Sequence, residues 1–532
     1  MIKTNIGYEK TGYFSKIIID YLGNEKDLQL FYDLPNQLES YSERIKKKQT
    51  EKTDRHALAE ALQKQYTGTK EIPSNIDLLK QPNTFTITTG HQLCIFTGPL
   101  YFIYKIVNAI KLAQTLKQHF PAYHFVPVYW MASEDHDFAE VNHVSIGNKK
   151  IKWETHQTGA VGEMDVKGLE LCIAEIEGLL GINKNTSVTI AALKNAYLKS
   201  KNLAEATRKF VHHLFGKYGL VVVDGNDRTL KSLFSSTIKD EILNGVSYDI
   251  VNKTNNALEK KYKIQVNPRE INFFYLYDKI RERIVKKEGD IFEVLNTNFT
   301  FTKEEIIKEI ENFPERFSPN VIMRPLYQET ILPNLAYIGG GGEIAYWLQL
   351  KSLFGYFKIS FPILVLRNSA LLVEEKIARK INSLSLEYAD LFLGKNVMLN
   401  KLVKEKMGAE NLLENEKVEL DNLMKKIVEK AKNVDYTLIK SAEGMGKRQI
   451  AMLNKMNDKL LKGSRKKEGI LDEKLTAIFD QLFPKQALQE REQNFLPFFT
   501  QQENFIDLLL ENFEMFTKDF HILDLNQKTN HP

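Results

Sequence analysis

The sequence predicts an α/β protein in which a mostly parallel sheet is followed by a long helical coiled coil. Short apolar runs rich in β-branched residues alternate with helical patterns between residues 85 and 366, which is typical of buried parallel strands. The spacing between these runs is uneven and indicates insertions. Finally, the 121 residues between Pro362 and Pro484 contain no proline and are rich in Lys, Glu, Leu and Met. An interior proline costs about 3 kcal/mol, so such a stretch favours long helices.

The apolar runs locate the expected strands. A helix is expected over residues 98–116, directly after the first strand. Ligands of such sheets bind beyond the carboxyl ends of the strands, so the residues directly after each run are the candidates for a binding site. The strands are predicted at 85–89, 124–132, 220–224, 320–323, 335–338 and 363–366.

The uneven spacing predicts two insertions. About 85 residues separate the second and third strands, and about 95 separate the third from the fourth, far more than one crossover helix needs. We expect the chain to divide as follows: first part of the core, 1–144; first insertion, 145–205; core strand and helix, 206–234; second insertion, 235–318; last part of the core, 319–384; helical coiled coil, 385–490; and a C-terminal tail packing back on the core, 491–532.

Within the proline-free stretch, five apolar residues step by 3, 4, 3 and 4, as in the seam of a coiled coil. A helical hairpin and a dimerising arm both fit this pattern. Such patterns more often belong to a structural scaffold than to a catalytic part of a protein. The segment SAEGMGKRQ is expected to form a bend or a reversal. The seam residues are Met424, Ile427, Ala431, Val434 and Leu438, and the interrupting glycines are Gly444, Gly446 and Gly463.

Composition excludes several classes of protein. The net charge of +5, from 73 Lys+Arg against 68 Asp+Glu, is too small over 532 residues to predict a nucleic-acid or membrane partner. Two cysteines, Cys94 and Cys172, exclude a disulfide scaffold and fit a reducing cytoplasm. The first residues lack the apolar region of a signal peptide. No P-loop, GxSxG, HExxH or kinase signature is present.

The first predicted strand ends in Thr89-Gly90-His91-Gln92, and Thr97-Gly98-Pro99 precedes the expected helix. Glycine permits close backbone approach, and free N–H groups at a helix start attract anions. His91 and Gln92 are therefore expected at the mouth of the sheet. A tight turn with a hydrogen-bonded histidine is the structural alternative.

The second strand leads into the densest polar cluster of the chain. Four carboxylates and two imidazoles within residues 134–143 are expected to shift one another's pKa values, as acid–base sites require. His136, Glu140 and His143 are spaced 4 and 3, so on a helix they would share a face and could bind a metal. A helix N-terminus stabilised by its acidic residues is the structural alternative. The remaining acidic residues are Glu134, Asp135 and Asp137.

The fifth strand runs into four glycines that precede a helical pattern, an arrangement that cradles anions. The motif Gly340-x-Gly342-x-x-Ala345 matches the dinucleotide fingerprint, and Arg367 ends the next strand where an NADP enzyme would bind the 2′-phosphate. An NADP-dependent oxidoreductase is thus an alternative. Arg324 and Arg367 also suit a carboxylate or phosphate, unless they form structural ion pairs. The glycines are Gly339, Gly340, Gly341 and Gly342.

Four segments resemble one known family, the cysteine ligases of bacillithiol biosynthesis (BshC). In order they are TTGHQLCIFTGPLYFIYKIVNAIKLA, VPVYWMASEDHDFAEVNH, LPNLAYIGGGGEIAYWLQLK and LFPKQALQERxQN. The commoner family form of the first has Gln at the position of His91. The resemblance implies a Rossmann-like core similar to class I aminoacyl-tRNA synthetases, two connecting-peptide insertions and a coiled coil that mediates homodimerisation. It also implies ligation of L-cysteine to glucosaminyl-malate, with an adenine nucleotide (ATP or ADP) as cofactor.

Amide formation needs an activated carboxylate and a deprotonated amine. We expect the turn at Thr97 and Gly98, the glycine loop, and Arg324 or Arg367 to stabilise the charge of the activated acyl group. The cluster 134–137 is expected to bind and deprotonate the amine, with His136 as the base, while His91 and Gln92 orient the substrate. A non-catalytic synthetase-like binding module, with the coiled coil as its interaction surface, is a further alternative. Five more residues complete the predicted binding set: Tyr101, Lys105, His143, Tyr337 and Glu343.

Overall fold

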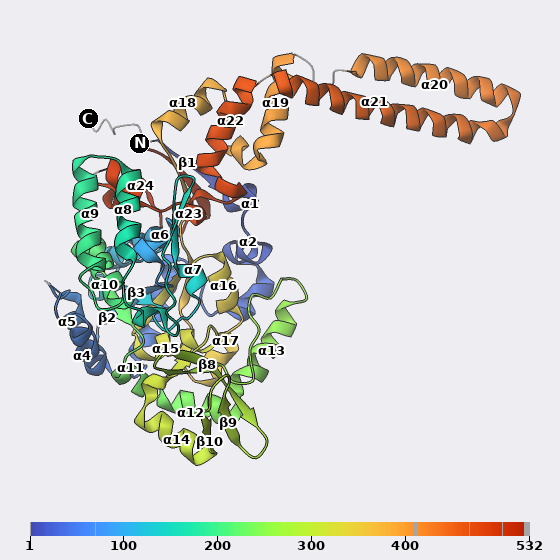
Figure 1. Cartoon of the computed structure of the whole chain (residues 1–532). Coiled ribbons are helices and arrows are strands. Elements are labelled where there is room, and N and C mark those ends of the chain that lie inside the picture. The colour runs from blue at the N-terminus through green and yellow to red at the C-terminus, as the bar shows by residue number, and fades with distance from the viewer. Residues whose placement is uncertain (1, 70, 408–412, 468, 503, 526–532) are drawn as a thin grey trace. The chain divides into compact units, whose positions relative to one another are not determined.

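The computed structural model describes residues 2–69, 71–407, 413–467, 469–502 and 504–525 (Figure 1). The chain divides into two compact units. The core unit comprises Asn5–Leu371 and Gln489–His521, and the arm unit comprises Met1–Thr4, Leu372–Leu488 and Ile522–Pro532. Part of the predicted C-terminal tail, residues 526–532, lies outside the described residues. Among the described helices, none is both long and apolar enough to cross a membrane.

The core unit contains the predicted parallel sheet. Every neighbouring pair of its five strands is parallel, and nearly every strand residue is buried, as expected when helices cover both faces. The α/β fold class is therefore confirmed. The strand order is β13 (Ile363–Leu366), β12 (Asn334–Gly339), β2 (Thr84–His91), β3 (His124–Met131) and β6 (Val221–Asp224).

The prediction of a strand at residues 320–323 is wrong. The Asn320 side chain accepts hydrogen bonds from the backbone N–H groups of Ile322 (2.8 Å) and Met323 (3.4 Å), so the chain turns there. It then enters helix α15 (Met323–Ile331), whose first turn carries Arg324. The true strand, β11 (Phe317–Pro319), belongs to another sheet.

Helices pack on the central sheet and fix its edges. Helix α6 (Tyr101–His119) lies against β2 and β3, α3 (Leu38–Gln49) packs against β12, and α10 (Leu203–Phe215) packs against β6. The helix after the glycine loop, α16 (Gly341–Leu348), packs on β13. Other helices of this unit are α2 (Lys16–Gly23), α4 (Arg55–Gln65), α5 (Asn75–Leu78) and α17 (Lys351–Tyr356).

Both long gaps between core strands hold elements of their own. The first contains α7 (Phe138–Val141), the hairpin of β4 (His143–Ile146) and β5 (Lys149–Lys152), and helices α8 (Leu169–Leu180) and α9 (Lys184–Tyr197). The second contains α11 (Arg228–Ser232), α12 (Ser235–Asn244), α13 (Val246–Leu258) and α14 (Lys303–Asn312) around an antiparallel sheet. That sheet has the order β10 (Thr300–Phe301), β9 (Ile291–Val294), β8 (Ile280–Lys287), β7 (Phe273–Tyr277) and β11.

In the arm unit, α20 (Glu414–Val434) and α21 (Ile439–Lys467) form a helical hairpin. In Figure 1 the two helices lie side by side. The chain reverses at Tyr436–Leu438, so the prediction of a reversal within SAEGMGKRQ is wrong: that segment lies inside α21. Gly446 faces α20 there, and a Cβ on it would lie 3.4 Å from the Cβ of Met424. The other helices of the unit are α18 (Glu375–Ser383), α19 (Lys395–Met407) and α22 (Gly469–Leu482).

The segment after residue 488 belongs to the core unit and supports the turn that follows β2. The Asn494 side chain donates hydrogen bonds to the carbonyl oxygens of Phe96 (3.0 Å) and Gly98 (2.6 Å). Its helices are α23 (Gln489–Glu492), α24 (Leu496–Gln501) and α25 (Phe505–Asn512). The remaining strands, β1 (Ile2–Gly7), β14 (Ala370–Val373) and β15 (Asp519–Asp524), contain residues of both units.

Candidate functional site

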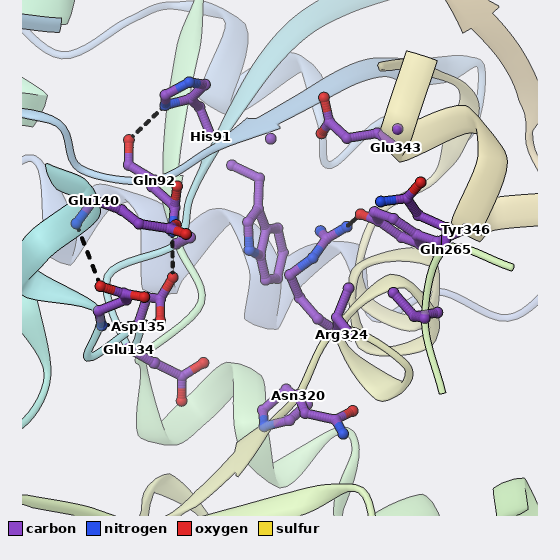
Figure 2. Close-up of a pocket in the computed structure, with 18 of the residues that line it drawn as sticks. His91, Gln92, Glu134, Asp135, Glu140, Gln265, Asn320, Arg324, Glu343 and Tyr346 are labelled. Carbon is purple, nitrogen blue, oxygen red and sulfur yellow. Dashed lines mark hydrogen bonds between the residues drawn. The ribbon is translucent and has the colours of Figure 1, made fainter. Parts of the chain in front are cut away.

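A cavity of about 1120 Å³ opens beyond the carboxyl ends of the central strands, within the core unit (Figure 2). Its walls come from the ends of β2, β3 and β12, from the start of α16, and from the second insertion. Most of the predicted site residues line it. They are His91, Gln92, Tyr101, Lys105, Glu134, Asp135, His136, Asp137, Arg324, Tyr337, Gly340, Gly341, Gly342, Glu343 and Arg367.

Four predicted site residues are not among the cavity-lining residues. The N–H of Gly98 donates to the Ile95 carbonyl (3.0 Å), and α6 begins only at Tyr101, so Gly98 does not offer a free helix N-terminus. Its φ of 64° and the proximity of the Cys94 side chain explain the glycine. Burial raises the pKa of the Cys94 thiol to about 12, which keeps it protonated. The four residues are Thr97, Gly98, His143 and Gly339.

One side of the cavity is acidic, and Gln92 joins its carboxylates. The Gln92 amide donates hydrogen bonds to Asp135 Oδ2 (2.8 Å) and to Glu140 Oε2 (2.6 Å). Asp135 Oδ1 in turn accepts the backbone N–H of His136 (2.8 Å). The end of β2 thus contacts the cluster that follows β3, because the two strands are neighbours in the parallel sheet.

His136, the predicted base, contacts an arginine of the second insertion. Its Nδ1 lies 2.7 Å from Arg281 Nη1, and because a guanidinium can only donate, Nδ1 accepts this hydrogen bond. The predicted helix face of His136, Glu140 and His143 does not form, because α7 is a single turn and His143 lies in β4. No three His, Cys, Asp or Glu residues in the described part of the chain are placed to hold a metal ion.

Glu134 is held by a buried lysine. Lys231, whose side chain is fully buried, forms an ion pair with Glu134 and donates a second hydrogen bond to the Phe317 carbonyl (2.7 Å). The Glu134 carboxylate is therefore already paired at the cavity wall.

His91 is a buried, neutral imidazole. Burial lowers its pKa to about 3, and the nearby Lys105 ammonium acts in the same direction. The ring Nδ1 lies 2.7 Å from the carbonyl of Gln92, so Nδ1 carries the proton and Nε2 is left as an acceptor. His91 can thus accept a hydrogen bond at the cavity wall without carrying charge.

Replacing His91 by Gln should make the free energy of unfolding less dependent on pH below about pH 6.5. The unfolded chain protonates His91 near pH 6.5 and the folded chain only near pH 3. The contribution of neutral His91 to stability is therefore complete above about pH 6.5 and is lost as the pH falls toward 3. Chemical unfolding of both proteins at steps between about pH 7 and pH 4 measures this. Between these pH values the free energy of unfolding should fall less in the variant than in the unmodified protein, by on the order of a few kcal/mol. An equal fall in both proteins would contradict the assignment of His91 as a buried neutral imidazole.

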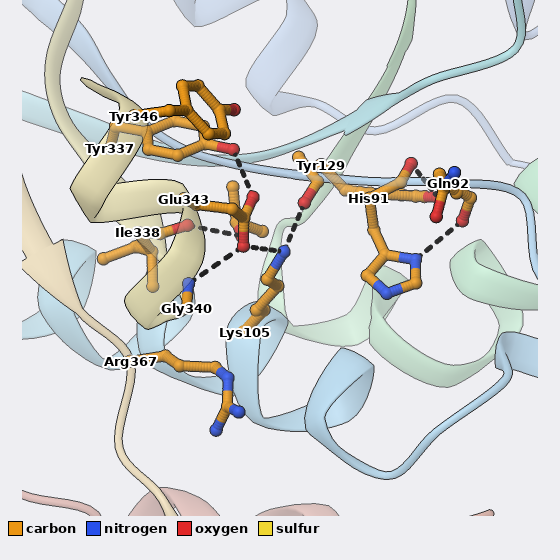
Figure 3. A network of polar contacts seen from close by, with 12 residues as sticks. His91, Gln92, Lys105, Tyr129, Tyr337, Ile338, Gly340, Glu343, Tyr346 and Arg367 are labelled. Carbon is orange, nitrogen blue, oxygen red and sulfur yellow. Dashed lines mark hydrogen bonds and ion pairs between the residues drawn. The ribbon is translucent and has the colours of Figure 1, made fainter. Parts of the chain in front are cut away.

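On the opposite side of the cavity, Glu343 occupies the mouth of the glycine loop (Figure 3). It accepts the N–H of Gly340 (2.9 Å) and the Tyr337 hydroxyl (2.7 Å), and it forms an ion pair with Lys105, which also donates to the Gly90 carbonyl (2.8 Å). Burial opposes its charge, but Lys105 and these hydrogen bonds outweigh that effect, so the pKa of Glu343 lies below its ordinary value. The protein's own carboxylate therefore takes the first N–H of the predicted anion cradle.

The two predicted arginines differ in what they contact. Arg367 is buried and forms an ion pair with Glu490 (2.6 Å), while its second terminal nitrogen donates to the Asn368 carbonyl and the Ser369 hydroxyl. Arg324 donates to Gln328 Oε1 (2.9 Å) and the Tyr346 hydroxyl (3.0 Å), both neutral. No described carboxylate lies within ion-pair distance of it. Of these two arginines, Arg324 is therefore the one available for an anion.

The second insertion supplies cavity residues that the sequence did not reveal. Arg281 and Arg283 alternate along β8, so they share one face of the strand, a period-2 pattern that could have been noticed. The others lie in irregular segments or on elements far apart in the chain, and no local pattern marks them. The additional lining residues include Gln265, Asn267, Arg269, Asn320, Tyr346 and Arg491.

The fold defines the class of protein: a Rossmann-like α/β protein with a helical hairpin in a separate unit. Its polar cavity lies at the carboxyl ends of the parallel strands, where such sheets bind ligands. Family models agree with both parts. "Bacillithiol biosynthesis BshC, N-terminal Rossmann-like domain" matches residues 1–368, and "Bacillithiol biosynthesis BshC, C-terminal coiled-coil domain" matches residues 370–525. The chain belongs to the BshC family of bacillithiol biosynthesis.

Curated relatives resemble the chain over most of its length. A protein of Flavobacterium psychrophilum is 43% identical, covering 92% of this chain and 93% of that protein, and one of Flavobacterium johnsoniae is 42% identical, covering 98% and 99%. Both are named "Putative cysteine ligase BshC". A solved structure titled as a putative arginyl-tRNA synthetase from Campylobacter jejuni is 12% identical, covers 87% of this chain and 94% of that chain, and superposes with a TM-score of 0.22. That score is too low to support an argument about fold.

Proposed function

We propose that this protein joins L-cysteine to glucosaminyl-malate through an amide bond, and the name of its relatives, "Putative cysteine ligase BshC", supports the cysteine part of this proposal. The observation that carries the proposal is the division of the cavity. An acceptor side, with Gln92 bridging Asp135 and Glu140, faces a cationic side where Arg324 has no carboxylate partner among the described residues. Amide formation needs both: acceptors for the protons of the amine and cations for the charge of the acyl group.

In this proposal the amine of the glucosaminyl group attacks the carboxyl carbon of cysteine. A carbon–nitrogen bond forms, the amine gives up a proton, and the carboxylate loses one oxygen with its activating group. Asp135 is the candidate proton acceptor, and the unprotonated Nε2 of His91 can accept a hydrogen bond from the amine. Arg324 is the candidate for binding the developing oxyanion, because a planar guanidinium offers several N–H donors.

An adenine nucleotide is the proposed source of activation. The cavity wall beside the glycine loop suits such a group at the start of α16, where Gly341 and Gly342 carry no side chain into the cavity and a Cβ on Gly342 would lie 3.7 Å from the Gln265 amide. Arg324 and the start of α16, where Gly341 and Gly342 line the cavity, would hold the phosphates, and the nucleotide would convert the carboxylate into an electrophile.

Mass spectrometry of reactions with purified protein tests the proposal. With cysteine, glucosaminyl-malate and ATP together, a thiol product equal in mass to the two substrates less one water should appear, and omission of any reactant should abolish it. Nucleotide that is not consumed would favour the non-catalytic module. The oxidoreductase alternative predicts an NADPH absorbance change, but the partners of Arg367 leave it poorly placed for a 2′-phosphate.

We also propose a cytoplasmic homodimer formed through the helical hairpin. Large apolar side chains are exposed along both helices of the hairpin, and Val434 is 80% exposed. An apolar face of this extent is normally covered by a partner. The exposed set comprises Val418, Leu423, Ile427, Val434, Met445, Met452 and Met456.

Replacing Ile427 and Val434 together by Asp should convert the dimer to a monomer in sedimentation velocity. Each carboxylate would be buried without a counter-ion, at a cost of several kcal/mol. Asn433→Asp, on the same helix, adds charge at an exposed polar position and should leave the dimer intact. An unchanged dimer in the double variant would place the interface elsewhere.

A further inference from the structure

The guanidinium of Arg324 is held in one orientation by groups that do not neutralise it. An arginine has five N–H donors, and among the described residues Arg324 uses two of them, on the Gln328 amide oxygen and the Tyr346 hydroxyl. Both acceptors are neutral, so the positive charge remains available to the cavity (Figure 2). The residues that hold these two acceptors in place therefore also determine the orientation of the Arg324 guanidinium toward an anion.

We propose that Gln328 and Glu329 are positioning residues that aim Arg324 into the cavity as an oxyanion donor. The inference rests on the proposed function only for the identity of the oxyanion, which is a carboxylate of the substrate or a phosphate of the nucleotide. Gln328 is fully buried, one turn after Arg324 on α15, and Glu329 is 1% exposed.

The directions of the hydrogen bonds establish the relay. The Gln328 amide nitrogen donates to Glu329 Oε1 (2.8 Å), and a charged carboxylate can only accept. The NH₂ group of Gln328 must therefore face Glu329, which leaves its carbonyl oxygen facing Arg324 Nη1 at 2.9 Å. With the amide reversed, two donors would meet at Arg324, and a buried donor without a partner costs free energy.

Glu329 is itself anchored to the central sheet. Its Oε1 also accepts the Asn334 side-chain amide (2.7 Å), and Asn334 Oδ1 accepts the hydroxyls of Thr86 (3.1 Å) and Thr88 (2.8 Å) on β2. Burial raises the pKa of Glu329, against the opposing charges of Lys48 and Arg44. A proton taken up there would go to Oε2, which has no hydrogen-bond partner in the described part of the chain, so Oε1 would remain an acceptor for both amides.

A double-mutant cycle between Gln328 and Arg324 tests the relay. Gln328→Met removes the acceptor at nearly constant volume. It should weaken binding of a probe oxyanion about fivefold to tenfold and raise KM more than it lowers kcat. In the Arg324→Met background the same change should have no further effect, because Gln328 acts through Arg324. Calorimetry with L-malate and separately with ADP reports binding without requiring ligation.

The matched control is Gln349→Met. Gln349 is also buried, but its side-chain oxygen accepts the N–H groups of Gln265 and Val266, and it does not contact Arg324. The effect of Gln349→Met on the binding free energy of either probe should add to the effect of Arg324→Met. If Gln328→Met does not fold, Gln328→Asn, which is one methylene too short to reach Arg324, should show the same weakening.

The outcomes separate the relay from the function. A selective effect on malate identifies a carboxylate as the ligand of Arg324, and a selective effect on ADP identifies a phosphate; either supports the relay. A non-additive cycle in a protein that forms no thiol product supports the relay while the proposed function fails. Additive effects of Gln328→Met and Arg324→Met, or no binding of either probe to the unmodified protein, would overturn it.

Discussion

Replacing Asp135 by Asn should lower the rate of thiol-product formation by about 10²–10⁴-fold, the range expected when a group that takes up a proton is lost. The amide keeps the shape of the carboxylate but cannot accept a proton. The melting temperature should stay within a few degrees, because Asp135 lies at the cavity wall, where water can replace the one hydrogen bond, from Gln92 or from the His136 N–H, that the amide NH₂ cannot accept. Product mass spectrometry and thermal unfolding measure the two quantities.

His143→Ala is the matched control. His143 belongs to the same cluster in the sequence but lies in β4, outside the cavity lining. Its replacement should leave the rate near that of the unmodified protein. Equal losses from the two substitutions, or a collapse of stability in Asp135→Asn, would mean that the cluster is structural.

Replacing Arg367 by Met should destabilise the protein by about 3–5 kcal/mol, because it leaves the Glu490 carboxylate buried without its counter-ion. The Glu490 side chain is fully buried and that of Arg367 is 4% exposed. Arg324→Met should have the opposite effects on stability and on ligand binding. It breaks no ion pair among the described residues, so it should cost little stability but lose oxyanion binding. Denaturant unfolding and calorimetry compare the two variants.

The double variant Arg367→Met with Glu490→Gln should recover most of the lost stability. Its amide oxygen can still accept the N–H of Ala370, which Glu490 Oε2 accepts at 3.0 Å, and no charge remains buried. If Arg367→Met instead keeps full stability and loses ligand affinity, Arg367 contacts the ligand, as the sequence alone predicted.

Local patterns predicted the central sheet and failed where a side chain decides the conformation. The buried runs of β3, β6, β12 and β13 are mostly apolar, and that of β2 is rich in β-branched Thr and Ile, so strands are evident from the sequence. The run at residues 320–323 has the same composition, but Asn320 caps the following turn. In the arm, heptad spacing predicted helices, whereas the glycines of SAEGMGKRQ suggested a bend. Gly446 instead allows α21 to approach Met424 closely.

The strand ends predicted most of one side of the cavity, because parallel strands bring their carboxyl ends to one edge. The sequence could not show which charges are already paired. Arg324 and Arg367 looked equivalent until the fold placed Glu490, more than 120 positions along the chain, against only one of them. The arginines of β8 were missed for the same reason, since only tertiary structure brings the second insertion to the strand ends.

A crystal structure of the protein soaked with L-cysteine, glucosaminyl-malate and a non-hydrolysable ATP analogue tests the central claim most directly. The account predicts both substrates in the cavity, with the glucosaminyl amine beside Asp135 and His91, and an oxyanion on Arg324. Ligand density found only on the helical hairpin, with the cavity holding solvent, would contradict the assignment of this cavity as the site of ligation.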